Sequence, residues 1–560
     1  MSTLPNRSSR RFAAGLVLLM GLAGTASAAT GARISRSLSD RIATGGSGEM
    51  VDVIVSGSAR TALRARVASR GGSSGRNLDL IDGFAARMPL SEVASLAADP
   101  RVTSIAIDQP VFAGKTLSPA AASSSPVRRE PIVEPRLTGA GVGVAVIDSG
   151  IYPHETLAGR ITGWVDLTAQ DRRAARNAPA DPMGHGTHVA GIIAGAGSAG
   201  FSGGVAPGAH LVSVKVLDRN GAGRSSDVIA ALDWCVAHAN ELSLRVVNMS
   251  LGQVVSEPLE TDPLAHAVER AWDAGLVLVT SAGNMGTVSH GYGTISSPGN
   301  HPLVITVGAL DDQGTADRRD DATAPFSSRG PARFDMVLKP DLVASGTAIV
   351  SLAAPRSTLD RMQSGSRSNR DGRYLAMSGS SMAAAQVSGA VALMLEASPE
   401  LTPDDVKARL MADASPIAGE DVYTRGAGAL DIDATLASPG HAMASASPRV
   451  AGEDGRVAID DISGAWGQQE LWNLESVYGE RALWGEEAPL SIDFFDDPCM
   501  TGEGIVWNNG VVWNNGVVWQ NGVVWNNGVV WNNGVVWNNG VVWNNGVVWN
   551  NGTESGTCPF

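Results

Sequence analysis

The sequence predicts an α/β fold with a parallel sheet and helices on both faces, and two observations carry this prediction. From about residue 137 to 436, segments such as "GVGVAVIDSG", "HLVSVKVLD", "RVVNMSLG", "GLVLVTSAGN" and "LVITVGAL" are β-branched and apolar throughout, as strands buried on both faces are. Helical patterns, including "SSDVIAALDWCVAHA" and "DPLAHAVERAWDAG", separate them. Strands that alternate with helices indicate a parallel sheet.

The N-terminus has the features of an export signal. Arg7, Arg10 and Arg11 precede the apolar run "FAAGLVLLMGLAG", and "ASA" at residues 26–28 is a typical small-residue cleavage site. The run is short for a membrane span, and no later segment offers about 20 consecutive apolar residues. We therefore expect a secreted or periplasmic protein; a retained N-terminal anchor is the alternative.

Residues 48–108 predict a compact α+β unit. "EMVDVIVSG" reads as its first strand and "RVTSIAID" as its closing strand, and "LDLIDGFAARM" reads as strands with a turn at Asp82-Gly83. "SARTALRARVASRGG" and "LSEVASLAADP" are expected to be helices, the second with Ser91 as its N-cap. The order β-α-β-β-α-β is the split arrangement of a ferredoxin-like fold. The stretch "SPAAASSSPVRREP" then indicates a linker.

Charge and cysteine content narrow the function classes. The chain carries a net charge of −14, which disfavours a nucleic-acid partner because phosphate binding needs a basic face. Cys235 lies in a helical pattern and is expected to be a buried small hydrophobe. Cys499 and Cys558 flank the terminal repeats; they would pair in an oxidising compartment, or else remain two free thiols.

The C-terminal tail repeats the hexapeptide "VVWNNG" from residue 504 onward. Val-Val-Trp favours a strand and Asn-Gly favours a tight reversal, so a meander of short strands and a solenoid that stacks Trp on Trp both fit. Envelope attachment, glycan contact and self-association are open as functions, and a low-complexity, aggregation-prone extension is the alternative. A decayed form of the hexad precedes the tail, with aromatic residues six apart at Trp466, Trp472, Tyr478 and Trp484.

Two histidines, His185 and His188, lie three residues apart in "GHGTHVAG", where a helix is expected to begin. Residues at this spacing share a helix face. A metal pair, a catalytic base with a structural neighbour, and two packed core histidines are the three interpretations. The metal pair is disfavoured because no third or fourth ligand lies at a suitable spacing.

Three motif blocks carry groups suited to nucleophilic catalysis. "VAVIDSGI" ends a strand with Asp148, "GHGTHVAG" opens a helix with His185, and "SGSSMAAAQVSGAVALML" opens a long apolar helix with Ser381. Asp, His and Ser in this chain order form one of the known triad orders. Over about 300 residues the sequence resembles the subtilisin-like serine peptidases (subtilases), and the segment before them resembles the inhibitory propeptide of that family.

The resemblance implies a role for each of these side chains. Ser381 would attack the scissile carbonyl, His185 would accept its proton, and Asp148 would hold the imidazole. His188 matches a structural position. Asn284, in "TSAGN", matches the side-chain donor of the oxyanion hole, with the backbone N–H of Ser381 as the second donor.

The resemblance also implies a peptide-binding edge. Ser250, Leu251 and Gly252, in "NMSLG", match the segment that pairs with an extended substrate as an added strand, although an ordinary strand exit is the alternative. Gly283 would help to wall the first specificity pocket, with Ser296 near it.

Around the nucleophile the sequence departs from the usual Gly-Thr-Ser-Met-Ala-x-Pro of the family. Here residues 379–385 read "GSSMAAA". Ser380 keeps the hydroxyl of the threonine, and it is a rival nucleophile that the family spacing disfavours. Ala385 replaces a proline expected near the start of the helix, where proline only pre-sets φ, so no catalytic group is lost.

We therefore expect a secreted serine endopeptidase that hydrolyses polypeptides through an acyl-enzyme and is made as an autoprocessed precursor, inhibited by its own propeptide. The alternative is a surface-anchoring or binding protein on the same scaffold. The chemistry requires no cofactor and we assign no metal ligand; structural calcium, which the family often binds, is left open because acidic pairs such as Asp311-Asp312 lack ligand spacing. The expected segments are a signal peptide (1–28), a propeptide (29–118), a peptidase domain (119–436), an acidic linker with degenerate hexads (437–498) and a repeat tail (499–560), which is the candidate for cell-envelope contact.

Overall fold

The computed structural model describes most of the chain between residues 33 and 460, together with eight short strands of the tail. The described ranges are 33–114, 137–168, 178–287, 292–362, 372–453 and 456–460, without residues 47, 316 and 443. The expected signal peptide, most of the acidic linker, Cys499 and Cys558 lie outside them. No helix among the described residues is long and apolar enough to cross a bilayer.

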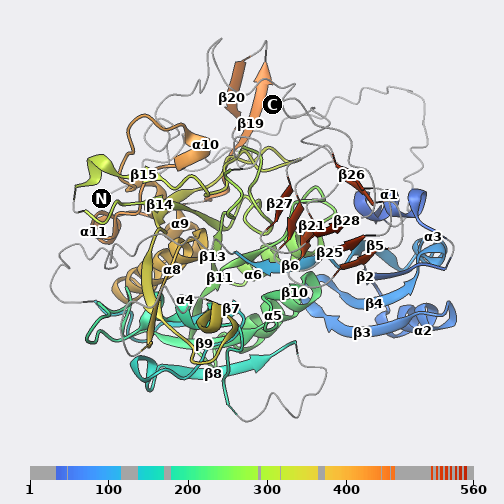
Figure 1. Cartoon of the computed structure of the whole chain (residues 1–560), viewed down its shortest axis with the longest axis horizontal. Coiled ribbons are helices and arrows are strands. Elements are labelled where there is room, and N and C mark those ends of the chain that lie inside the picture. The colour runs from blue at the N-terminus through green and yellow to red at the C-terminus, as the bar shows by residue number, and fades with distance from the viewer. Residues whose placement is uncertain are drawn as a thin grey trace, which may run out of the picture.

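An eight-stranded sheet forms the centre of the large domain, with the strand order β15-β14-β13-β11-β7-β9-β8 and β16 beside β14 (Figure 1). All neighbouring strands run parallel except β14 and β15, which confirms the predicted α/β class with a mostly parallel sheet. The strands are β7 (Gly143–Asp148), β8 (Ile161–Asp166), β9 (His210–Lys215), β11 (Leu244–Met249), β13 (Val277–Ser281), β14 (Ile305–Asp311), β15 (Ala322–Thr323) and β16 (Leu342–Ser345).

The sheet lies between two pairs of helices (Figure 1). On one side, α4 (His185–Ala194) and α8 (Ser380–Ala397) pack together, and α8 crosses β11, β13 and β14. On the other side, α5 (Ser225–His238) and α6 (Pro263–Asp273) pack together. The parallel strands run between these layers, so their carboxyl ends meet the N-termini of α4 and α8.

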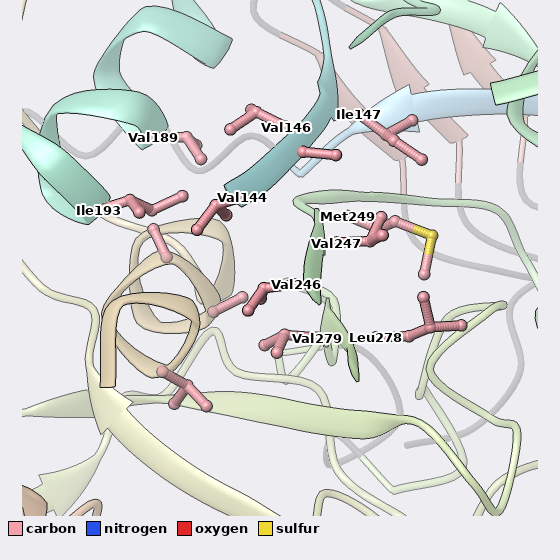
Figure 2. Close-up of a cluster of buried hydrophobic side chains, with 14 of the residues drawn as sticks. Val144, Val146, Ile147, Val189, Ile193, Val246, Val247, Met249, Leu278 and Val279 are labelled. Atoms are coloured by element: carbon pink, nitrogen blue, oxygen red, sulfur yellow. The ribbon is translucent and has the colours of Figure 1, made fainter. Parts of the chain in front are cut away.

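The apolar runs become strands because both of their faces are buried. Figure 2 shows Val144 and Val146 of β7 near Val189 of α4, whereas Met249 and Leu278 gather on the opposite side of the strands. All five side chains are fully buried. Burial of each such side chain stabilises the fold by about 1.5–3 kcal/mol.

The N-terminal unit is a five-stranded sheet with the order β1-β5-β2-β4-β3. From β2 to β5 the elements follow the predicted order β-α-β-β-α-β, and Asp82 has the left-handed φ of 49° that its turn requires. The prediction of Ser91 as the N-cap is wrong, because Ser91 lies inside a 3-10 turn (Leu90–Glu92) and Glu92 occupies the N-cap position of the following helix, without a side-chain cap bond. The sequence analysis did not predict β1 or α1. The elements are β1 (Arg33–Ile34), α1 (Arg36–Thr44), β2 (Met50–Gly57), α2 (Arg60–Ser69), β3 (Ser73–Leu78), η1 (Asp79–Ile81), β4 (Gly83–Pro89), α3 (Val93–Ala97) and β5 (Val102–Ile107).

A short strand, β6 (Pro110–Ala113), joins the two units. It lies between β10 (Ala222–Arg224) and β12 (Leu251–Gly252) of the large domain and runs antiparallel to both. Val111 and Ala113 of β6 belong to the apolar core of the large domain. The N-terminal unit is therefore attached through a strand that completes a three-stranded sheet.

The remaining elements lie around the sheet. The hairpin of β17 and β18 packs on α4 through β17. The bounds are η3 (Glu155–Leu157), β17 (Ile349–Leu352), α7 (Thr358–Met362), β18 (Tyr374–Met377), α9 (Pro403–Ala412), α10 (Val422–Arg425), α11 (Ile432–Ala437), β19 (Arg449–Glu453) and β20 (Arg456–Asp460).

In the tail, each hexad contributes one strand of three residues, and strands that lie three hexads apart pair in parallel. The register sets Trp507 against Trp525 and Trp525 against Trp543. A meander would pair consecutive strands antiparallel, whereas this register is that of stacked turns. The strands are β21 (Val506–Asn508), β22 (Val512–Asn514), β23 (Val518–Gln520), β24 (Val524–Asn526), β25 (Val530–Asn532), β26 (Val536–Asn538), β27 (Val542–Asn544) and β28 (Val548–Asn550).

We predict that Leu278→Ala lowers the free energy of unfolding by about 2–5 kcal/mol, because it opens a cavity in a layer that is fully buried. The matched change Met362→Ala, at a side chain that is 56% exposed, should have little effect. Denaturant unfolding of both variants measures the difference. Equal losses would contradict this assignment of the core.

Candidate active site

The three residues of the predicted triad lie at element ends on the same edge of the sheet. Asp148 is the last residue of β7, His185 is the first residue of α4, and Ser381 is the second residue of α8. All three are fully buried. His185 Nδ1 lies 2.9 Å and 2.8 Å from the two carboxylate oxygens of Asp148. This contact fixes the ring and leaves Nε2 as its second nitrogen; Nε2 is buried and has no hydrogen-bond partner among the described residues.

The hydroxyl of Ser381 lies close to two backbone carbonyls. Its Oγ lies 3.2 Å from the carbonyl oxygen of Ser250 and 3.3 Å from that of Gly114, and its one hydrogen can be donated to either acceptor. Within the described part of the chain, no hydrogen bond joins it to His185. Catalytic hydrogen bonds are often long before the reacting complex forms. We therefore expect the hydrogen bond between Ser381 and His185 to form during the reaction.

Close approach of α4 to β7 requires glycine at position 186. A Cβ atom added at Gly186 would collide with the carbonyl oxygen of Gly150 and lie 3.1 Å from Cβ of Asp148. The backbone N–H of Ser149 donates to Asp148 Oδ1 at 2.6 Å, which gives the carboxylate a second donor. Gly186 therefore permits the contact between Asp148 and His185.

Asp181 organises the start of α4, and the sequence analysis missed it. Its Oδ1 accepts from Gly184 N at 2.7 Å and from Ser149 Oγ at 2.8 Å. Its Oδ2 accepts from both the N–H and the hydroxyl of Thr187. Burial raises the pKa of Asp181, and these donors oppose that rise. Asp181 lies three residues before the N-cap residue Gly184, so it does not occupy the position where the sequence would predict a capping side chain.

Asn284 is oriented by Ser380. Asn284 Oδ1 accepts from Ser380 N at 2.9 Å and lies 3.0 Å from Ser380 Oγ, while Nδ2 is buried without a partner among the described residues. A Cβ atom added at Gly114 would lie 3.2 Å from Nδ2 and 2.9 Å from Ser381 Oγ. The amide of Asn284 and the hydroxyl of Ser381 therefore both lie beside the Cα of Gly114. Ser380 also contacts both the N–H and the carbonyl of Gly283, which are the contacts of a positioning residue.

The predicted peptide-binding segment does pair with an extended strand. Leu251 and Gly252 pair antiparallel with Ala113 and Phe112 of β6. Ser250 Oγ donates to the carbonyl of Ser381 at 3.0 Å, which ties this segment to the start of α8.

Two glycines, Gly252 and Gly283, let serine side chains approach the backbone closely beside the peptide-binding segment. An added Cβ would lie 2.7 Å from Ser296 Oγ at Gly252, and 2.7 Å from Ser328 Oγ at Gly283, whose φ is 108°. A Cβ added at Gly283 would also lie 3.2 Å from Ser296 Oγ, so Ser296 lies beside both glycines.

Ala385 lies further into the helix than the sequence analysis expected. It is the sixth residue of α8 and is fully buried, so it is not near the N1 position where proline only pre-sets φ. At this position the helical N–H points to the carbonyl of Ser381, four residues earlier. That carbonyl already accepts from Ser250 Oγ. With alanine rather than proline here, the backbone of Ser381 is held by two donors.

His188 is a buried neighbour of the site. Its Nε2 lies 3.1 Å from the carbonyl oxygen of Leu375 in β18. Burial lowers the pKa of His188 to about 3, so the ring is neutral at ordinary pH. Cys235 is a free, buried thiol whose pKa burial raises to about 12.

A buried Asp–His pair at a strand end and a serine at a helix start, on a parallel sheet, define an α/β serine hydrolase. The model of the Subtilase family matches residues 139–442. Serine protease AprX of Bacillus subtilis is 44% identical over 304 residues, which cover 53% of this chain and 66% of the relative. Subtilisin E of the same organism is 31% identical over 366 residues, which cover 64% and 82%. The chain belongs to the subtilase family and is a subtilisin-like serine endopeptidase.

Two further relatives widen the comparison. The extracellular serine proteinase of Thermus sp. is 36% identical over 340 residues, which cover 60% of this chain and 71% of that protein. Fervidolysin from Fervidobacterium pennivorans, described as a keratinolytic enzyme related to subtilisin, superposes with a TM-score of 0.55 at 22% identity, over 73% of this chain and 63% of that one. This likeness concerns the fold alone.

We predict that Asp181→Asn lowers stability by about 1–3 kcal/mol and reduces kcat/KM, because an amide NH₂ would face N–H donors at the start of α4. Glu241→Gln, at an exposed acid, is the matched control. Unfolding and peptidase assays on both variants test this. Unchanged stability in Asp181→Asn would contradict the capping role.

We also predict a pH dependence that comes from His188. The unfolded ring binds a proton near pH 6.5, whereas the folded ring does so only near pH 3, so stability is lost as pH falls through this interval. Between pH 7 and pH 5 the loss is about 2 kcal/mol. In urea unfolding of inactive protein, His188→Gln should lack this part of the loss, and His441→Gln, at a largely exposed side chain, should retain it. The same loss in both variants would contradict the assignment.

Proposed function

We propose that Ser381, His185 and Asp148 act as nucleophile, general base and orienting carboxylate in the hydrolysis of polypeptides. One observation carries the proposal above the others. A peptide strand already lies in the site, with the carbonyl of Gly114 within hydrogen-bond distance of Ser381 Oγ. Such a carbonyl is the group that this chemistry attacks.

The proposed reaction follows from the contacts. Ser381 Oγ attacks the carbonyl carbon and its proton passes to His185 Nε2, while Asp148 stabilises the imidazolium. The oxyanion accepts from Asn284 Nδ2 and from the backbone N–H of Ser381 at the start of α8. His185 then protonates the leaving amine, and water hydrolyses the acyl-enzyme by the same route.

Substrates are proposed to bind as an added strand between β10 and β12. β6 occupies this place with antiparallel pairing on both sides, so another extended peptide would meet the same backbone groups. Ser250, Leu251 and Gly252 form one edge of this site, and Gly283 forms part of its wall.

We propose that the N-terminal unit is an inhibitory propeptide of a secreted or periplasmic precursor. Carboxylates of the large domain cap helices of this unit: Asp233 accepts from Asp79 N and Leu80 N, and Glu257 accepts from Arg36 N and Ser37 N. The export signal that the sequence predicts at residues 1–28 and the relative named as extracellular support the location. For the Trp hexads of the tail we propose contact with the cell envelope, because a run of eight tryptophans is suited to association.

We expect Ser381→Ala to abolish both casein hydrolysis and maturation of the purified precursor, with a loss of at least about 10³-fold in kcat/KM. Ser202→Ala, at an exposed serine, should behave as wild type. Assays of caseinolysis and precursor mass measure both effects. Unchanged turnover in Ser381→Ala would instead favour a different nucleophile, and no turnover in the wild type would favour the binding-protein alternative.

We expect Asn284→Ala to lower kcat by about 10²–10³-fold with little change in KM, because its amide would contact the oxyanion only as charge develops. The exposed Asn240→Ala is the control. A rise in KM without a fall in kcat would show that Asn284 binds the ground state instead. Steady-state kinetics with a chromogenic peptide separates the two.

A further inference from the structure

The register of β6 determines which peptide bond of the chain faces the nucleophile. Val111 pairs with Gly223, Phe112 with both Ala222 and Gly252, and Ala113 with Leu251. Ala113 N also donates to the carbonyl of Gly221 at 3.0 Å. The next carbonyl along the chain, that of Gly114, is the one that Ser381 Oγ contacts at 3.3 Å.

We propose that the precursor cuts itself at the peptide bond that follows Gly114, so that the mature enzyme begins at Lys115. This inference rests on the proposed function of Ser381. It places the processing site inside the segment 29–118 that the sequence analysis assigned to the propeptide, ahead of the end of that segment. The linker that follows Lys115 would then belong to the mature protein.

The step uses the proposed chemistry on the chain itself. A bond forms between Ser381 Oγ and the carbonyl carbon of Gly114, and the C–N bond to residue 115 breaks. The proton of the hydroxyl passes through His185 to the departing amine of Lys115. Water then hydrolyses the ester, which leaves a carboxylate on Gly114 and returns the serine hydroxyl.

Contacts upstream of the strand hold its register. Asp108 accepts from Ser226 N at 2.9 Å and from Ser226 Oγ at 2.6 Å, at the start of α5. Ser225 N donates to the carbonyl of Gln109 at 2.9 Å. A slip of one residue would break these bonds and turn the buried Val111 out of the core of the large domain. The register is therefore determined by side chains as well as by the ladder.

Glycine at position 114 leaves room for the side chains of Ser381 and Asn284. An added Cβ would lie only 2.9 Å from Ser381 Oγ and 3.2 Å from Asn284 Nδ2, so the hydroxyl or the amide would have to move. Val111, three residues earlier, is fully buried. We infer that the site processes a small residue immediately before the cut bond and a branched aliphatic residue three positions before that small residue.

The test is a time course of maturation of the full-length precursor, with N-terminal sequencing of the large fragment and intact mass of both fragments. The first cut is expected after Gly114, with Lys115 as the new N-terminus. A first cut at another bond that still depends on Ser381 would overturn this inference and leave the proposed function standing. A cut after Gly114 that persists in purified Ser381→Ala would overturn the proposed function instead.

Variants at two glycines sharpen the test. Gly114→Val should slow the first cut by at least about tenfold or move it to another bond, because the side chain would displace the attacking group or the oxyanion donor. Gly46→Val is the control, since an added Cβ at Gly46 meets nothing within 4 Å. Unfolding of Gly114→Val in the Ser381→Ala background shows whether the precursor still folds. Normal cutting after residue 114 in a folded Gly114→Val precursor would contradict the geometric argument.

Discussion

The contact between Asp148 and His185 is the interaction on which the account depends. It exists because a parallel sheet brings the end of β7 to the start of α4, and because Gly186 lets the two elements approach. Both side chains are fully buried, so removal of either partner would leave a polar group without its compensation. Asp181 fixes the first turn of α4 by accepting from backbone N–H groups. It therefore positions the ring of His185 through the helix backbone and does not contact the ring itself.

The N-terminal unit and the large domain share a sheet and an apolar core. The strand β6 continues the N-terminal unit into the three-stranded sheet that it forms with β10 and β12 of the large domain (Figure 1). Its residues Val111 and Ala113 belong to the apolar core of the large domain. Carboxylates on both sides cap helices of the other unit, as Asp108 and Asp233 do. The contacts that attach the N-terminal unit to the large domain also hold the carbonyl of Gly114 beside Ser381. The N-terminal unit therefore fills the candidate active site whenever it is attached in this way.

Much of this could be predicted from the sequence, for reasons that are local. Strands such as β7 and β13 are apolar on both faces, and the positions of Asp148, His185 and Ser381 follow from motif blocks at element ends. β6 could not be predicted, since a four-residue strand that begins with proline is defined only by its neighbours in space. Asp181 lies in a loop, and its role appears only when Ser149 and Thr187 converge on it. The hexads alone fitted two pairings, and only the long-range register distinguishes them.

The most direct measurement of the central claim is covalent trapping with a fluorophosphonate, followed by peptide mass spectrometry of the adduct. The account predicts a single adduct on Ser381 in the mature enzyme, strongly reduced labelling when His185 is replaced by alanine, and little labelling of a precursor whose site is still filled by β6. An adduct on Ser380, or labelling of Ser381 that is unaffected by the loss of His185, would contradict it.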